Sequence, residues 1–73
     1  MKHTGVYARL MVEMLLQGVD SHALSEKTGM SYPTLRRKLR GDGSIRIEEA
    51  ILIRSALNSE LPLEQLFARR HPA

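Results

Sequence analysis

Four cations lie within five positions of the stretch YPTLRRKLRG, residues 32–41. They are Arg36, Arg37, Lys38 and Arg40. Like charges one turn apart on a helix repel each other and lower its stability, so a reason other than folding is expected for them. The guanidinium group of arginine donates hydrogen bonds in a planar fork that matches phosphate oxygens and the guanine edge. The stretch therefore has the chemistry of a nucleic-acid contact, and a solvated basic face without a partner is the alternative.

The excess positive charge of the chain is confined to this segment. The 73 residues carry 11 Lys+Arg against 8 Asp+Glu, a net charge of +3. Positive and negative side chains cancel within residues 1–30 and again within residues 44–73. Residues 31–43 hold the four cations against Asp42 alone. This segment is the electrostatic pole of the molecule, as expected for a protein that meets a polyanion.

Other residues that could do chemistry have simpler explanations. Asp20, Ser21 and His22 are neighbours at a predicted helix start, where they cannot converge as a catalytic triad does, and capping accounts for them. Glu48 and Glu49 fall in a first helical turn, where the helix dipole favours anions. The three histidines have no metal-ligand spacing: His3, His22 and His71. We expect neither an enzyme nor a bound metal, cofactor or small-molecule ligand.

Helices are predicted on either side of the basic stretch. In the first helix, apolar residues recur at helical spacing: Tyr7, Leu10, Met11, Met14 and Leu15. Thr4 is its expected cap and Gly18 its expected end. A short second helix is expected to be capped by Asp20 or Ser21 and to end at Gly29.

The basic stretch itself is predicted to form a third helix, over about residues 31–40. Ser31 is placed to cap it, and Gly41 to end it. Pro33 falls in the first turn, where its missing N–H has no helical partner to lose, so the proline starts the helix rather than breaking it.

The helical wheel assigns each side of this third helix. At about 100° per residue, Leu35 and Leu39 define the buried side. Arg37 then points away from the core, with Pro33 one turn before it and Arg40 toward the helix end.

Two more helices are predicted downstream. Ile45 and Ala50 are expected to staple the start of a fourth helix. Its expected inner face consists of Ile47, Ala50, Ile51 and Leu57. A last short helix contains Leu63, Leu66 and Phe67, followed by a loose tail at 69–73. The predicted fold class is all-α, a compact five-helix bundle forming one domain over residues 1–73. Without cysteine or an apolar stretch of membrane-spanning length, we expect a cytoplasmic protein that does not contact membrane.

The stretch DSHALSEKTGMSYPTLRRKLRG resembles the helix-turn-helix of lambda-repressor-like (Xre/Cro-type) regulators of phages and bacteria. The resemblance rests on the spacing of Leu24, Gly29, Met30, Ser31, Thr34, Leu35 and Gly41. The run IRIEEAILIRSALNSELPLEQLF is similar to the fourth and fifth helices of that family, so the resemblance covers residues 5–68. Two positions depart from it: Ser25 replaces the usual alanine, and Thr28 replaces a larger aliphatic residue, which predicts a weak second helix.

The resemblance implies that the second and third helices form the helix-turn-helix and that the third is a recognition helix in the major groove. Carried over by position, the base-reading residues are Tyr32, Pro33 and Arg37, with Arg36 at the flank. Residues at the start of the second helix are expected to contact phosphate. Two cations near the end of the third helix are assigned to phosphate as well. The expected phosphate-binding set is Ser21, His22, Lys38 and Arg40.

The resemblance thus implies a sequence-specific transcription regulator that binds double-stranded DNA and is similar to phage repressors and Cro. Repressor and activator both stay open at this point. Since one short helix covers few base pairs, we expect a homodimer that reads half-sites roughly 34 Å apart. The expected dimer contact is Leu63, Leu66 and Phe67. The alternative is a protein-interaction module on the same fold, antitoxin-like or part of an anti-repressor, which binds an acidic protein. Such a module would more often expose an apolar patch.

Overall fold

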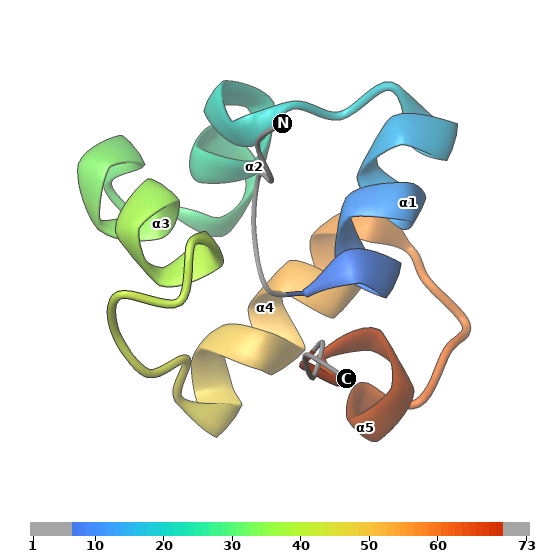
Figure 1. The fold of residues 1–73 in the computed structure, drawn as a ribbon. Coiled ribbons are helices and arrows are strands. Elements are labelled where there is room, and N and C mark those ends of the chain that lie inside the picture. The colour runs from blue at the N-terminus through green and yellow to red at the C-terminus, as the bar shows by residue number, and fades with distance from the viewer. Residues whose placement is uncertain (1–6, 70–73) are drawn as a thin grey trace, which may run out of the picture.

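The computed structural model describes residues 7–69, and this part of the chain folds into helices joined by short connections (Figure 1). The helices are α1 (Ala8–Gln17), α2 (Ser21–Thr28), α3 (Tyr32–Leu39), α4 (Ile47–Leu57) and α5 (Leu63–Leu66). The predicted all-α class and the five-helix arrangement are confirmed, and the packing of α2 on α3 is consistent with a helix-turn-helix. The predicted cap Thr4, the histidines His3 and His71, and residues 70–73 of the predicted tail lie outside the described residues.

Local chemistry sets the helix ends around α2, as predicted. Gly18 ends α1 with φ 67°, and Gly29 ends α2 with φ 79°, a left-handed conformation that costs glycine little. The Asp20 carboxylate caps α2 by accepting the N–H of Ala23 at 2.9 Å. The hydroxyl of Ser31 caps α3 by accepting the N–H of Thr34 at 3.4 Å. Each end thereby satisfies backbone groups that the helix leaves without a partner.

Side chains also fix the connection from α4 to α5. Asn58 ends α4 in the left-handed region, with φ 52°. The hydroxyl of Ser59 accepts the N–H of Leu61 at 3.1 Å, and Nε of Arg54 donates to the carbonyl oxygen of Leu61 at 2.6 Å. These bonds hold the chain as it turns back toward α1, so α5 packs against both α1 and α4.

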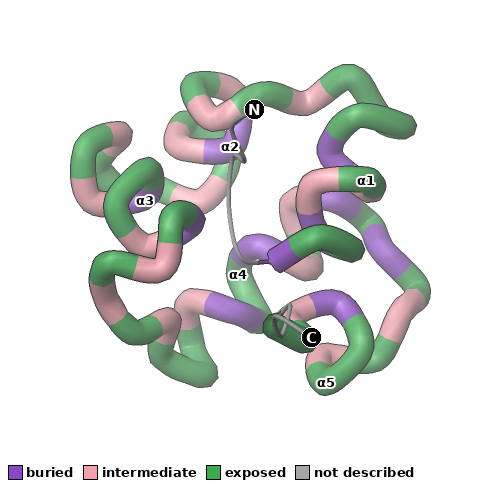
Figure 2. Tube along the Cα trace, in the orientation of Figure 1, coloured by how far each residue is buried: buried purple, intermediate pink, exposed green. Residues whose placement is uncertain are grey.

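The hydrophobic core receives side chains from every helix and from the residue before α1 (Figure 2). Its buried members are Tyr7, Leu10, Met14, Leu24, Leu35, Leu39, Ile53, Leu57 and Leu66. Helix α4 packs against α1, α2 and α5, so it is the central support of the bundle. The rings of Tyr7 and Phe67 meet edge to face with centroids 5.8 Å apart, which joins the two ends of the described chain.

Three residues predicted to lie inside are exposed. Leu15 of α1 is 80% exposed, and Ile47 and Ile51 of α4 are 64% and 50% exposed. Ile53 is fully buried in their place. Both helices carry more apolar residues than one face can hold, so apolar spacing alone cannot choose the face that turns inward.

Across residues 7–69, none of the helices has the length and apolar composition needed to cross a lipid bilayer.

Candidate nucleic-acid interface

The hydroxyl groups of Ser25 and Thr28 form hydrogen bonds at the turn between α2 and α3. Oγ of Ser25 donates to the carbonyl oxygen of Met30 at 2.7 Å. Oγ1 of Thr28 donates to the carbonyl oxygen of Leu24 at 2.8 Å and accepts the N–H of Met30 at 3.3 Å. Ser25 and Thr28 are the two departures from the family pattern noted in the sequence. Here their hydroxyls satisfy backbone groups at the end of α2 and in the turn.

Helix α3 is anchored on one side and open on the other. Leu35 and Leu39 are 0% and 5% exposed, as predicted, and they dock α3 into the core. Pro33 and Arg37, one turn apart, are exposed. Among the described residues, no ion pair or side-chain hydrogen bond engages Arg37. Its guanidinium group is therefore available to a ligand on the outer side of α3.

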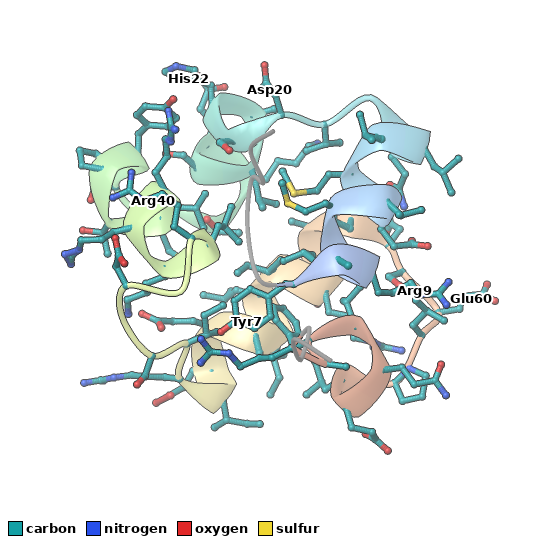
Figure 3. The ribbon with its side chains drawn as sticks, in the orientation of Figure 1. Tyr7, Arg9, Asp20, His22, Arg40 and Glu60 are labelled. Carbon is teal, nitrogen blue, oxygen red and sulfur yellow. The ribbon has the colours of Figure 1, made fainter. Side chains whose placement is uncertain are left out.

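A stacked pair of rings joins the starts of α2 and α3. The rings of His22 and Tyr32 are nearly parallel, 7° apart in plane, with centroids separated by 3.8 Å. Nη1 of Arg36 donates to the Tyr32 hydroxyl at 3.1 Å, and its guanidinium carbon lies 5.7 Å from the Tyr32 ring centroid. The three side chains form one surface cluster in which the Tyr32 hydroxyl, already an acceptor, keeps its own proton to donate. Figure 3 shows His22 on the α2–α3 side of the molecule, far from Arg9 on α1.

Two acidic residues engage the other cations of α3. Nζ of Lys38 lies 2.8 Å from both carboxylate oxygens of Glu49, and its side chain is only 15% exposed. Lys38, predicted to contact phosphate, is thus paired with Glu49 of α4, and its contact with phosphate stays a prediction. Arg40 lies 3.1 Å from Asp42, but both side chains are more than half exposed, so this ion pair can exchange for a phosphate.

Glu49 is stabilised as a carboxylate by its surroundings. The hydrogen bond from Lys38 and, next, the backbone N–H of Arg46 at 2.9 Å lower the pKa of Glu49 below its ordinary value. Sequence reasoning assigned Glu49 to the helix dipole alone and missed its bond to Lys38. The two residues are eleven positions apart in different helices, so no local spacing rule connects them.

The predicted DNA-binding residues lie on one side of the molecule but do not separate into two sets. His22, predicted to bind phosphate, stacks on Tyr32, predicted to read bases. Ser21, the first residue of α2, is half-buried. The exposed cations of this surface are Arg36, Arg37 and Arg40. We call the surface formed by His22, Tyr32, Pro33 and these three arginines the α3 surface.

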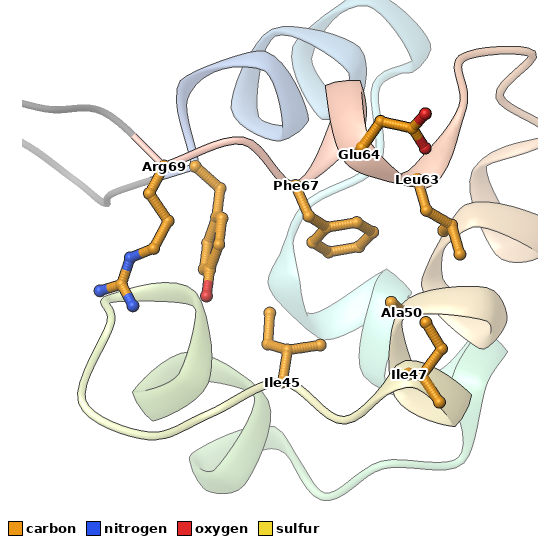
Figure 4. Close-up of a pocket in the computed structure, with 8 residues that line it drawn as sticks. Ile45, Ile47, Ala50, Leu63, Glu64, Phe67 and Arg69 are labelled. Carbon is orange, nitrogen blue, oxygen red and sulfur yellow. The ribbon is translucent and has the colours of Figure 1, made fainter.

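The predicted dimer contact needs a correction. Leu66 is 0% exposed, so its side chain belongs to the core of a single chain and cannot meet a second one. Leu63 and Phe67 are half-buried and line a hollow of about 550 Å³ between α4 and α5 (Figure 4). Ile45 and the exposed Ile47 line the same hollow. The hollow itself was not predicted from the sequence.

Residues 7–69 contain no group of three or more metal-ligating side chains that could hold a metal ion. The chain matches no family model, no curated protein and no solved structure.

Proposed function

We propose that the chain is a sequence-specific regulator of transcription that binds double-stranded DNA through the α3 surface. The observation that carries the proposal is the outer side of α3: three arginines project from a helix whose opposite side is anchored by buried leucines. A helix of this kind fits the major groove, where guanidinium groups meet base edges and phosphates. The sequence resemblance to Xre/Cro-type regulators supports the same assignment.

The contacts divide into two kinds in this proposal. Arg37 extends furthest from the core and donates its fork of N–H groups to a base edge, with Pro33 beside it as an apolar surface. Tyr32 and Arg36 form a second base-reading group, since their hydrogen bond leaves the Tyr32 hydroxyl proton and the remaining N–H groups of Arg36 to donate. Arg40, at the end of α3, and Ser21, at the start of α2, contact phosphate. His22 combines a phosphate contact with support of the Tyr32 ring.

We further propose that two copies act together on DNA. A single α3 surface spans too few base pairs to single out one site in a genome, whereas two copies related by a two-fold axis read a site with inverted symmetry.

A second candidate function has one specific observation in its favour. Helices α1 and α4 expose large apolar side chains, and a protein-interaction module would use such side chains to bind another protein. They are Val12, Leu15, Leu16, Ile47, Ile51 and Leu52. In an antitoxin-like or anti-repressor component, these faces and the cationic α3 surface would meet an acidic protein.

One experiment separates the two functions. Purified protein is used to select bound molecules from a pool of random duplex DNA, and the bound sequences are read. A regulator enriches one motif, and a dimer enriches a motif with inverted symmetry. A pool that remains random after several rounds at low salt would refute the DNA proposal and leave the protein-interaction module.

A further inference from the structure

Helix α1 is apolar well beyond its buried face. Its inner face carries the buried Leu10 and Met14. Its outer face, defined here by Ala8, Val12, Leu15 and Leu16, is exposed, with Leu15 at 80% and Leu16 at 77%. A helix that is apolar on both faces is normally covered on both. We propose that the α1 outer face binds the same face of a second copy of the chain, with the two α1 helices antiparallel.

The spacing on the outer face suits another helix. Ala8, Val12 and Leu15 lie at i, i+4 and i+7, the spacing of a seam between two packed helices, and Leu16 follows Val12 by one turn. Ala8 and Val12 are small enough to allow close approach, and Leu15 and Leu16 project at the other end of the helix. An antiparallel arrangement places the small end of one helix against the leucines of the other. The face is thus complementary to itself, as a two-fold contact requires.

The charges beside the seam identify a second copy as the partner. Arg9 and Glu13 lie one turn apart along the same flank of α1, and neither has an ion-pair partner among residues 7–69. An antiparallel pair brings identical flanks together. If the helices cross at the level of Met11, Arg9 lies level with Glu13 of the second copy, and the two-fold axis repeats this pair. Each chain therefore carries both the cation and the anion that complement an identical chain.

The position of α1 keeps this contact apart from the α3 surface. Figure 1 shows α1 and α3 on opposite sides of the molecule, so pairing through α1 leaves both recognition helices uncovered. The inference deepens the two-copy part of the proposed function, but it concerns a contact that forms without DNA. It also changes the expected spacing: recognition helices at the outer ends of a pair should read half-sites more than one helical turn apart.

Sedimentation equilibrium of the full chain over a range of concentrations tests the contact. Two turns of helix make a small interface, so we expect a weak dimer whose average mass rises with concentration. Leu15→Lys places a charge in the seam of both copies and should weaken dimerisation by at least about tenfold. Ile47→Lys is the matched control, since it adds the same charge at an exposed apolar site beside the α4–α5 hollow. It should leave the mass unchanged.

Charge reversal tests the antiparallel arrangement. Arg9→Glu and Glu13→Arg should each weaken the dimer, because each places like charges opposite one another. The double variant restores opposite charges and should return the dissociation constant to within about threefold of the wild-type value. Thermal melts of each variant check the fold. If Leu15→Lys lowers the melting temperature, Leu16→Lys takes its place, with the same expected loss.

Three results would overturn the inference. A wild-type chain that stays monomeric at every concentration has no such contact. Loss of the dimer in Ile47→Lys but not in Leu15→Lys would place the second copy on the α4–α5 hollow. A double reversal as weak as the single ones would exclude the antiparallel pairing. Failure of the DNA proposal is distinct, because a chain that selects no DNA site can still lose its dimer in Leu15→Lys.

Discussion

Nζ of Lys38 lies 2.8 Å from both carboxylate oxygens of Glu49, so a charged contact joins the last turn of α3 to the first turn of α4. The basic run in the sequence therefore contains one cation that positions the helix and three that face outward. Helix α3 is held by this ion pair as well as by Leu35 and Leu39 in the core.

Loss of the ion pair should lower stability modestly. Glu49→Gln removes the charge that faces Lys38 but keeps a group that can accept hydrogen bonds. We expect the free energy of unfolding at pH 7 to fall by about 0.5–1 kcal/mol, the range for an ion pair near the surface. Urea unfolding of Glu49→Gln, Lys38→Met and the double variant gives the coupling between the two residues. A coupling close to zero would show that the pair does not stabilise the fold.

The same pair predicts a pH dependence. Because the Lys38 hydrogen bond lowers the Glu49 pKa in the folded state, its stabilisation is present above the ordinary pKa of 4.5. It is lost as the pH falls through the lower folded pKa. The stability difference between wild type and Glu49→Gln should therefore narrow as the pH drops below 4.5. Urea unfolding at a series of pH values measures it, and a difference that stays constant down to the acid transition would contradict the assignment.

Arg37→Ala should change which DNA is preferred. If Arg37 donates two hydrogen bonds to a guanine, its loss costs about 1–3 kcal/mol on the best site and relaxes the preference at one base pair. The fold should be unaffected, since the side chain is exposed and one source of like-charge repulsion is removed. Titrations on the selected site and on single-base variants of it measure the effect. Unchanged base preference in this variant, with preference lost in Arg40→Ala, would mean that the recognition face is wrongly placed.

Arg40→Ala should weaken binding to all DNA alike. With four to six phosphates neutralised by the bound protein, log K should fall against log salt with a slope of about −4 to −5. Arg40→Ala should make that slope about one unit shallower, and matched and scrambled duplexes should lose equal affinity. Lys38→Met is the control, because it also removes one positive charge. Since Lys38 is paired with Glu49, the salt dependence of this variant should match that of the wild type. A slope in Lys38→Met that is as shallow as the slope in Arg40→Ala would show that Lys38 also contacts phosphate.

Tyr32→Phe tests the cluster at the start of α3. The variant keeps the ring that stacks on His22 and removes only the hydroxyl that accepts from Arg36. We expect binding to the best site to weaken by about 0.5–1.5 kcal/mol, the value of one hydrogen bond, with thermal stability unchanged. Equal weakening on scrambled DNA would instead show that the hydroxyl contacts phosphate. Fluorescence anisotropy on the two duplexes distinguishes these outcomes.

The helix ends near the candidate site were predictable because their causes are local. Asp20, Gly29 and Ser31 act on backbone groups within three or four positions, so the sequence contains the whole interaction. The buried side of α3 was equally predictable, because only Leu35 and Leu39 among its eight residues are large and aliphatic. The helical wheel set by these two leucines likewise identified the outer side of this helix, where Arg37 is exposed.

The buried face of α4 and the ion-pair partner of Lys38 could not be predicted in this way. The α4 sequence IEEAILIRSAL offers apolar residues on several sides, and packing against α2 and α5 selects Ile53 over Ile47 and Ile51. The partner of Lys38 depends on where α3, packed on α2, lies relative to α4, which follows from the assembled core. Such contacts between distant helices are set by tertiary packing rather than by residue spacing.

The edge-to-face contact between Tyr7 and Phe67 has a consequence for synthesis on the ribosome. Tyr7 precedes all five described helices and Phe67 follows them, so during translation α1 cannot find α5 until the helices between them have been made. Until then, Leu10 and Met14 lack the neighbours that complete their burial. We therefore expect folding to finish only once α5 has emerged from the ribosome.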